Sequence, residues 1–169
     1  MWQFLWFINY CSQDSAKKLD RYDKLILEAL QKDGRISNVN LAGLVSLSES
    51  ACLRRVRALE ESGIIDRYAA LVSQAAVGLQ GDVFVNIALH REVERELAAF
   101  EEAVRNIPEV MECYLMTGEF DYLLRVVVSD MADFERIHRD SLTRLPGVAR
   151  VNSSVTIRTV QKKTELPLH

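Results

Sequence analysis

The sequence has little of what disulfide-stapled, zinc-binding or membrane-spanning proteins need. Among its 169 residues are three cysteines, Cys11, Cys52 and Cys113, which are too few and too scattered for a disulfide framework or a zinc site. The apolar run at residues 1–11 is far shorter than the roughly 20 residues that span a bilayer. We therefore expect no metal, no disulfide and no membrane span, and a location in the reducing cytoplasm.

The first 18 residues differ from the rest of the chain. Residues 1–11 (MWQFLWFINYC) carry no charge, and they lack both the basic start and the cleavage site of a signal peptide. They also lack the Lys or Arg that an amphipathic membrane anchor would place on its polar face. The alternatives are a frayed tail, an apolar arm docked on the body, or a start codon placed too early. We expect this extension, residues 1–18, to be dispensable.

The overall charge also limits the function. The formal net charge is −3, which argues against coating nucleic acid by bulk electrostatics but leaves room for a local basic patch. Charged residues at 27% and hydrophobic residues at 49% are near the averages for soluble globular proteins. An ordered globular chain is therefore expected.

Residues 19–65 show helical periodicity that is interrupted by turn signals. Asp20 can cap a first helix, Ser37 or Asn38 a second, and Ser48 a third. Three short helices joined by tight turns are typical of a helix-turn-helix domain. The expected ends of these helices are Gly34, the pair Ser46 and Leu47, and Gly63.

The third helix carries the DNA-binding prediction. At about 100° per residue, its buried stripe of Cys52, Val56 and Leu59 lies opposite a polar face. That polar face holds Ser50, Arg54 and Arg57. A helix fits the major groove and Arg can bond a guanine edge at two points, so Arg54 is expected to read a base. Ser50 and Arg57 are expected on the phosphates. The alternative is a solvated face whose arginines pair with Glu60 and Glu61.

Arg55 lies at the edge of the buried stripe of this helix. An edge position also suits an ion pair inside the domain, with Asp33 or Glu28 as the expected partner. The predicted DNA-binding residues are Ser48, Ser50, Arg54, Arg55 and Arg57.

The rest of the chain predicts an α+β domain behind an extended linker, with the linker at residues 66–80 and the domain at residues 81–169. Alternation indicates strands and helical spacing indicates helices, which gives the order βαββαβ of a ferredoxin-like sandwich. With both helices on one face, the other face of the sheet is expected to be apolar and to meet a second subunit. The expected strands are 83–89, 110–117, 122–129 and 148–160, and the expected helices are 93–107 and 134–145.

Several motifs, taken in order, resemble the Lrp/AsnC regulators from about Leu19 to the C-terminus. The motifs are residues 19–23 (LDRYD), 33–38 (DGRISN), 47–57 (LSESACLRRVR), 59–65 (LEESGII), 113–114 (CY), 117–122 (TGEFDY), 145–148 (LPGV) and 166–168 (LPL). The resemblance implies an N-terminal winged helix-turn-helix and a C-terminal amino-acid-sensing domain. It also implies dimers that assemble further, commonly to octamers, on promoters of amino-acid metabolism genes. Ser46 stands where the family usually has Gly, and residues 1–18 have no counterpart in the family.

The resemblance also places an effector site at the turn between the second and third strands, where subunits meet. In that turn, Gly118 permits a close approach of backbone N–H groups to a carboxylate, and Asp121 suits an α-ammonium group. A plain hairpin turn is the alternative. The residues implied for the effector site are Met116, Thr117, Gly118, Phe120, Asp121, Met131, Ser154 and Thr156. The turn is most similar to that of leucine-responsive members, so a branched-chain or other apolar amino acid is the expected effector.

We therefore expect a sequence-specific DNA-binding transcription regulator whose assembly or DNA affinity responds to a small amino acid, with no cofactor. The alternative is an amino-acid-sensing adaptor, or a regulatory subunit of a metabolic enzyme, that does not bind DNA. Catalysis is not expected, because the three histidines at 90, 138 and 169 are scattered. The sequence also shows no nucleophile–base pairing and no phosphate-binding loop.

Overall fold

The computed structural model describes residues 18–91 and 93–168, which form two compact units. One unit contains residues 18–70 together with residues 162–168, and the other contains residues 71–161. Of the N-terminal extension, residues 1–17 lie outside the described residues.

The first unit contains the three predicted helices, α2 (Arg21–Lys32), α3 (Asn38–Val45) and α4 (Glu49–Glu61). The predicted caps are confirmed, with Ser37 rather than Asn38 at the start of α3. The side chains of Asp20, Ser37 and Ser48 each accept a hydrogen bond from the backbone N–H three residues later. Each cap satisfies a donor that the first helical turn leaves unpaired. The buried core of this unit is formed by Ile26, Leu27, Leu41, Ala42, Val45, Cys52 and Leu59.

Ser46 forms the tight turn between α3 and α4. Its backbone is left-handed, at φ 56° and ψ 46°, and it is the only residue other than glycine with positive φ among the described residues. A side chain in this conformation costs about 1–2 kcal/mol because Cβ approaches the following carbonyl oxygen. This is the position where the resembled family usually has Gly, so the chain carries strain at the turn that precedes α4.

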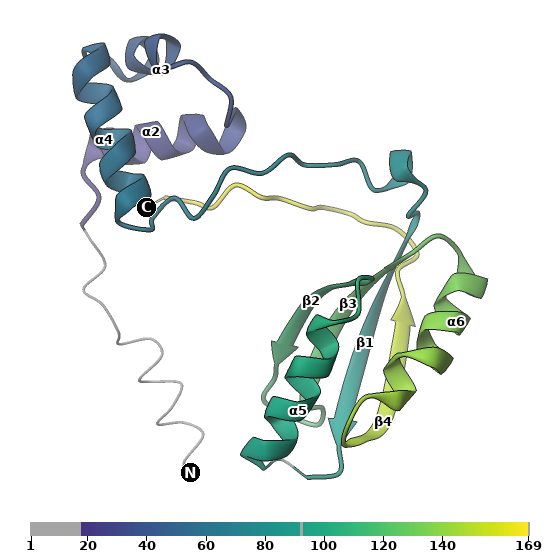
Figure 1. The fold of residues 1–169 in the computed structure, drawn as a ribbon. Coiled ribbons are helices and arrows are strands. Elements are labelled where there is room, and N and C mark those ends of the chain that lie inside the picture. Colours follow the sequence, from purple (N-terminus) through teal and green to yellow (C-terminus); the bar gives the residue numbers. More distant parts are fainter. Residues whose placement is uncertain (1–17, 92, 169) are drawn as a thin grey trace. The chain divides into compact units, whose positions relative to one another are not determined.

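The second unit has the predicted ferredoxin-like order. Its elements are β1 (Gly81–Leu89), α5 (Glu94–Arg105), β2 (Val110–Leu115), β3 (Tyr122–Val128), α6 (Met131–Asp140) and β4 (Val148–Val155), with short 3-10 turns η1 (Ala75–Val77) and η2 (Leu142–Arg144). The strands form one antiparallel sheet in the order β2-β3-β1-β4. Both helices cover the same face of that sheet (Figure 1).

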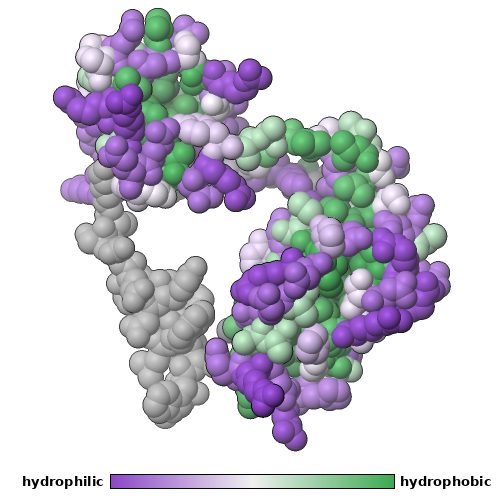
Figure 2. Space-filling model, viewed as in Figure 1, coloured by the Kyte–Doolittle hydropathy of each residue, from purple (hydrophilic) through white to green (hydrophobic). Residues whose placement is uncertain are grey.

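The core of this unit lies between the sheet and the two helices. Alternate residues of β1 point toward the helices, so Val83, Val85 and Ile87 are fully buried against residues that include Phe100 and Ile137. The outward surfaces of α5 and α6 are mostly hydrophilic, with hydrophobic atoms showing between them (Figure 2). The helix face of the sheet is therefore closed over a single core.

Two of the elements predicted for this unit end five residues earlier than predicted, at 155 instead of 160 and at 140 instead of 145. The last strand stops at Val155 and not at residue 160, because Val155 already pairs with Val83 and β1, its partner, begins only two residues earlier, at Gly81. After Thr156 donates its N–H to Asp82 O, the chain leaves the sheet. Helix α6 likewise ends at Asp140, and the chain continues as the short turn η2.

The face of the sheet away from the helices is not uniformly apolar, which also corrects the prediction. Arg125 of β3 lies on this face and is only 9% exposed. It donates from Nε to Asp82 at 2.8 Å, from Nη1 to Glu112 at 3.0 Å and from Nη2 to Gln74 at 3.2 Å. Strand alternation places this charged group among half-exposed apolar neighbours such as Phe84. Any partner of this face therefore meets a mixed surface.

The strained turn gives a first prediction. We expect Ser46→Gly to raise the free energy of unfolding of the first unit by about 1 kcal/mol, since glycine adopts positive φ without a Cβ clash. Calorimetry together with hydrogen exchange of the α3 and α4 amides measures the gain. Ser62→Gly is the matched control, because Ser62 also ends a helix but has ordinary φ of −83°. A gain at Ser62, or none at Ser46, would contradict the argument.

Candidate DNA-binding and effector sites

Helix α4 presents two unpaired arginines to solvent. Arg54 and Arg57 are both exposed, whereas Cys52 and Leu59 on the opposite side are buried. Within residues 18–91 and 93–168, neither arginine makes an ion pair or a side-chain hydrogen bond. The alternative of pairs with Glu60 and Glu61 is not seen among the described residues, and Glu60 instead accepts a hydrogen bond from the Tyr68 hydroxyl at 2.9 Å. The outward face of α4 therefore carries two arginines whose charge no ion pair among the described residues neutralises.

Ser48 and Ser50 lie at the start of the same helix, and both are exposed. The Ser48 hydroxyl caps the helix by accepting from the Ala51 N–H at 3.3 Å, and it lies 3.4 Å from the Ser50 hydroxyl. The first turn of a helix carries free N–H groups and a partial positive charge, both of which favour a phosphate. The structure thus brings Ser48, Ser50, Arg54 and Arg57 together on one helix.

Arg55 has a different environment. Its Nη1 lies 2.7 Å from Asp20 Oδ2 and 2.8 Å from Asp23 Oδ1, and its guanidinium lies 5.5 Å from the centre of the Tyr22 ring. The predicted partners Asp33 and Glu28 are wrong, because Arg55 faces the N-terminal end of α2, where the two capping carboxylates lie. The pKa of Asp20 is lowered, first by the Asp23 backbone N–H and then by Arg55. Arg55 therefore ties α4 to α2, and its role at DNA stays a prediction.

The predicted effector turn, residues 117–121, is hydrogen-bonded to β1 at its base. Asp121 donates its backbone N–H to Ile87 O at 2.9 Å and accepts the Met116 N–H at 2.8 Å. Its carboxylate Oδ2 accepts the Leu89 N–H at 2.6 Å. Gly118, at φ 128°, has a backbone conformation that residues other than glycine rarely adopt. Asp121 therefore has a structural partner far away in the sequence, in addition to any ligand it binds.

One further residue at this turn, Arg150 of β4, was not among the predicted site residues. Its Nη2 lies 2.6 Å from Glu119 Oε1, and its guanidinium lies 4.7 Å from the centre of the Phe120 ring. Arg150 reaches the turn because it pairs with Ala88 near the end of β1. Only the register of β4 against β1 could have indicated this contact.

The remaining predicted effector residues lie at the other end of the sheet. Asp121 bonds to β1 at Ile87, whereas Thr156 bonds to it at Asp82. Five residues of strand separate these two points by about 17 Å. Ser154 pairs with Phe84 and Met131 follows directly on the end of β3, both at the Asp82 end. The structure does not bring the two groups together within one chain.

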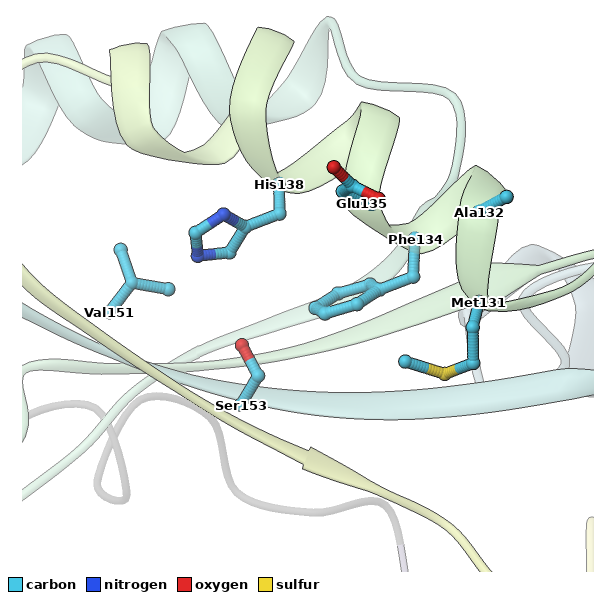
Figure 3. Close-up of a pocket in the computed structure, with 7 residues that line it drawn as sticks. All are labelled: Met131, Ala132, Phe134, Glu135, His138, Val151 and Ser153. Carbon is cyan, nitrogen blue, oxygen red and sulfur yellow. The ribbon is translucent and has the colours of Figure 1, made fainter.

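Met131 lines a groove of about 680 Å³ between α6 and β4 (Figure 3). Side chains from α6 point across this groove toward β4, from which the Ser153 hydroxyl points back (Figure 3). Ser154 is on the opposite face of the sheet, since successive strand residues alternate. The groove is lined by Met131, Ala132, Phe134, Glu135, His138, Val151 and Ser153.

The described residues hold neither a metal-binding cluster nor a membrane span. Among residues 18–91 and 93–168, no cluster of three or more His, Cys, Asp or Glu is arranged to hold a metal ion. In the same part of the chain, no helix is both long enough and apolar enough to cross a membrane.

Comparison with known proteins agrees with this geometry. The family model described as "Lrp/AsnC ligand binding domain" matches residues 82–166, and the one described as "Winged helix-turn-helix DNA-binding" matches residues 19–66. The leucine-responsive regulatory proteins of Klebsiella pneumoniae and of Escherichia coli K12 are each 43% identical over 151 residues, which cover 89% of this chain and 92% of theirs.

Solved structures show the same similarity. A transcriptional regulator from Neisseria meningitidis in complex with L-Met is 39% identical with a TM-score of 0.85, over 89% of this chain and 97% of that one. An AsnC family transcriptional regulator from Agrobacterium tumefaciens is 37% identical with a TM-score of 0.84, over 88% of this chain and 97% of that one. By sequence and by fold, the chain belongs to the Lrp/AsnC family of DNA-binding transcription regulators.

Proposed function

We propose that this regulator reads promoter DNA with α4 and that an apolar amino acid changes its assembly or its DNA affinity. The proposal that α4 reads DNA rests on its two exposed arginines, Arg54 and Arg57, which have no partner among the described residues. An arginine already paired to a carboxylate would have to give up that pair before binding DNA. These two have no such pair to give up.

The two arginines have different roles on DNA. Arg54 is about one and a half turns into α4 from the capped end. A recognition helix contacts base edges near this end, so we assign Arg54 to a base. Arg57 lies further along the same face, and we assign it, with Ser48 and Ser50, to phosphates. A base contact gives sequence preference, whereas phosphate contacts give affinity that falls with salt.

For the effector, the relatives indicate the chemical class. The two curated relatives are leucine-responsive regulatory proteins, and the Neisseria regulator is in complex with L-Met, so both indicate apolar amino acids. In this chain, the turn offers Asp121 for the ammonium group and the backbone of Thr117 and Gly118 for the carboxylate. Exposed apolar side chains stand nearby for the ligand's side chain, among them Met116, which is 44% exposed.

The proposed effector site is completed by a second copy of the chain. Thr156 and Asp121 bond to β1 five residues apart, and that separation of about 17 Å exceeds the length of an amino acid. One ligand contacts both groups only if the turn of one subunit meets Met131, Ser154 and Thr156 of another. We therefore propose a homodimer that assembles further, to an octamer as the resemblance implies, with effectors between subunits.

The α4 assignment predicts different results for three neighbouring arginines. Arg54→Ala should cost about 1–3 kcal/mol of operator affinity and relax the preference at one base pair. Arg57→Ala should weaken binding to all sequences alike and reduce the salt slope by about one. Arg55→Ala should lower the melting temperature, because it breaks the pairs with Asp20 and Asp23.

Gel shifts on genomic fragments and on a mutated operator measure the DNA affinity and base preference of the three arginine variants. Calorimetry of each variant measures its melting temperature. If Arg54→Ala binds its operator with unchanged affinity and preference, the assignment of α4 to DNA reading is wrong. Wild-type protein that shifts no genomic fragment but binds an amino acid would instead support the adaptor function.

If Asp121 binds the ammonium group of the effector, removing its charge should lower ligand affinity without lowering the stability of the fold. Asp121→Asn keeps an oxygen that accepts the Leu89 N–H, so the melting temperature should stay near that of the wild type. It loses the negative charge that binds the ammonium group, and a hydrogen bond to a charged group contributes about 1.5–3 kcal/mol. Calorimetric titration with L-leucine and L-methionine should therefore show affinity lowered ten- to a hundredfold. Unchanged affinity would move the site away from this turn.

The two-subunit site predicts complementation between variants. Asp121→Asn removes the turn half of the site, and Met131→Asp removes the other half, so neither variant alone should bind tightly. When the two are refolded together, random mixing joins an intact turn to an intact Met131 in roughly a quarter of the sites. Titration should recover that fraction with wild-type affinity. If no tight site returns, the two halves do not meet between subunits.

A further inference from the structure

We propose that Arg150 binds the α-carboxylate of the effector, and that Glu119 holds Arg150 until the effector replaces it. The proposal rests on the proposed function, since it adds a residue to the same site. Its starting observation is the 2.6 Å ion pair between Arg150 Nη2 and Glu119 Oε1, in which Glu119 supplies the carboxylate that a free amino acid also carries.

Charges of both signs lie at the same end of the sheet. Arg150 pairs with Ala88 on β1, and the Asp121 carboxylate accepts the N–H of the next residue, Leu89. An amino acid in its zwitterionic form carries one positive and one negative group. Arg150 with Asp121 is complementary to that pair, whereas the turn backbone alone complements only the carboxylate.

The Glu119 carboxylate is a replaceable partner. The Arg150 side chain is 55% exposed and that of Glu119 is 71% exposed, so the pair is solvated and screened by salt. Such pairs add little to stability, so breaking the pair with Glu119 costs little when a ligand carboxylate binds Arg150. Glu119 therefore competes with the ligand without blocking it.

Phe120 keeps the guanidinium in place during this exchange. The Arg150 guanidinium lies 4.7 Å from the centre of the Phe120 ring, within the range of a cation–π contact. Phe120 is half-buried and sits beside Asp121, whose backbone and carboxylate are fastened to β1. When Glu119 leaves, Arg150 remains oriented by the ring. The displaced Glu119 charge then becomes part of the surface that the turn presents to a neighbouring subunit.

The proposal predicts opposite effects for the two partners of the ion pair. In calorimetric titration of the full chain with L-leucine and L-methionine, Arg150→Gln should weaken binding at least tenfold, and Arg150→Lys should recover part of the loss. Glu119→Gln should tighten binding severalfold, because it removes the competing carboxylate. If the Arg150–Glu119 ion pair only stabilises the turn, both Arg150→Gln and Glu119→Gln should weaken binding.

Two controls isolate the carboxylate. Arg105 and Glu102 of α5 form an exposed pair at 3.1 Å, so Arg105→Gln and Glu102→Gln match the charge changes away from the turn and should leave affinity unchanged. Leucinamide has an amide in place of the carboxylate. Its weak binding to the wild type should be insensitive to Arg150→Gln.

The outcomes separate this proposal from the one it rests on. Failure of the wild type to bind any of the twenty amino acids would overturn the proposed effector function itself. If the wild type binds but Arg150→Gln has no effect, or if Glu119→Gln weakens binding as Arg150→Gln does, the Arg150 proposal alone is wrong. Equal affinity of the wild type for leucine and leucinamide would also overturn it.

Discussion

The pairing of β1 with β3 on one side and β4 on the other decides where every group of the second unit lies. Val83, Val85 and Ile87 are fully buried and point toward the helices, so a slip of one residue would turn this apolar row outward and expose it. The register is therefore held by the core. That same register brings Arg150 of β4 beside the turn that precedes β3, although the two are about 30 residues apart in the sequence.

In the first unit, the position of a residue around helix α4 likewise decides which groups its side chain contacts. Successive residues of α4 point in directions about 100° apart, so Arg54 and Arg55, although adjacent, have different neighbours. Arg55 is held by the two carboxylates at the start of α2, and Arg54 faces solvent. The ion pairs of Arg55 join α4 to the start of α2, and the strained Ser46 turn precedes α4. A rigid helix then presents its outward arginines in a defined geometry, which sequence-specific reading requires.

Features that depend on the spacing of neighbouring residues could be predicted from the sequence. Contacts between segments far apart in the sequence could not. Caps three residues from their donors, helix faces and the βαββαβ order all follow from neighbouring residues, and the structure confirms them. The overlong last strand, the partners of Arg55 and the contact of Arg150 with the turn each depend on which distant segment lies alongside. The polar cluster around Arg125 was missed for the same reason, since Gln74 is 51 residues away from it. Composition alone predicted an apolar face there.

The separation of the two halves of the proposed effector site bears on how a ligand would act on DNA binding. Stretches without helix or strand, residues 66–73 and 156–161, join the sheet unit to the helix-turn-helix unit. Within one chain, a change in the sheet unit can reach the helix-turn-helix unit only along these stretches. A ligand held between subunits acts differently, because it shifts assembly by its differential affinity for the assembled form. Coupling of about 1–3 kcal/mol changes affinity several-fold to a hundredfold. Assembly also sets the distance between α4 copies along the DNA. A dimeric DNA-binding protein binds well only where this distance matches the spacing of the two half-sites. Because the proposed site has one half at each end of the sheet, it favours control through assembly over control within one chain.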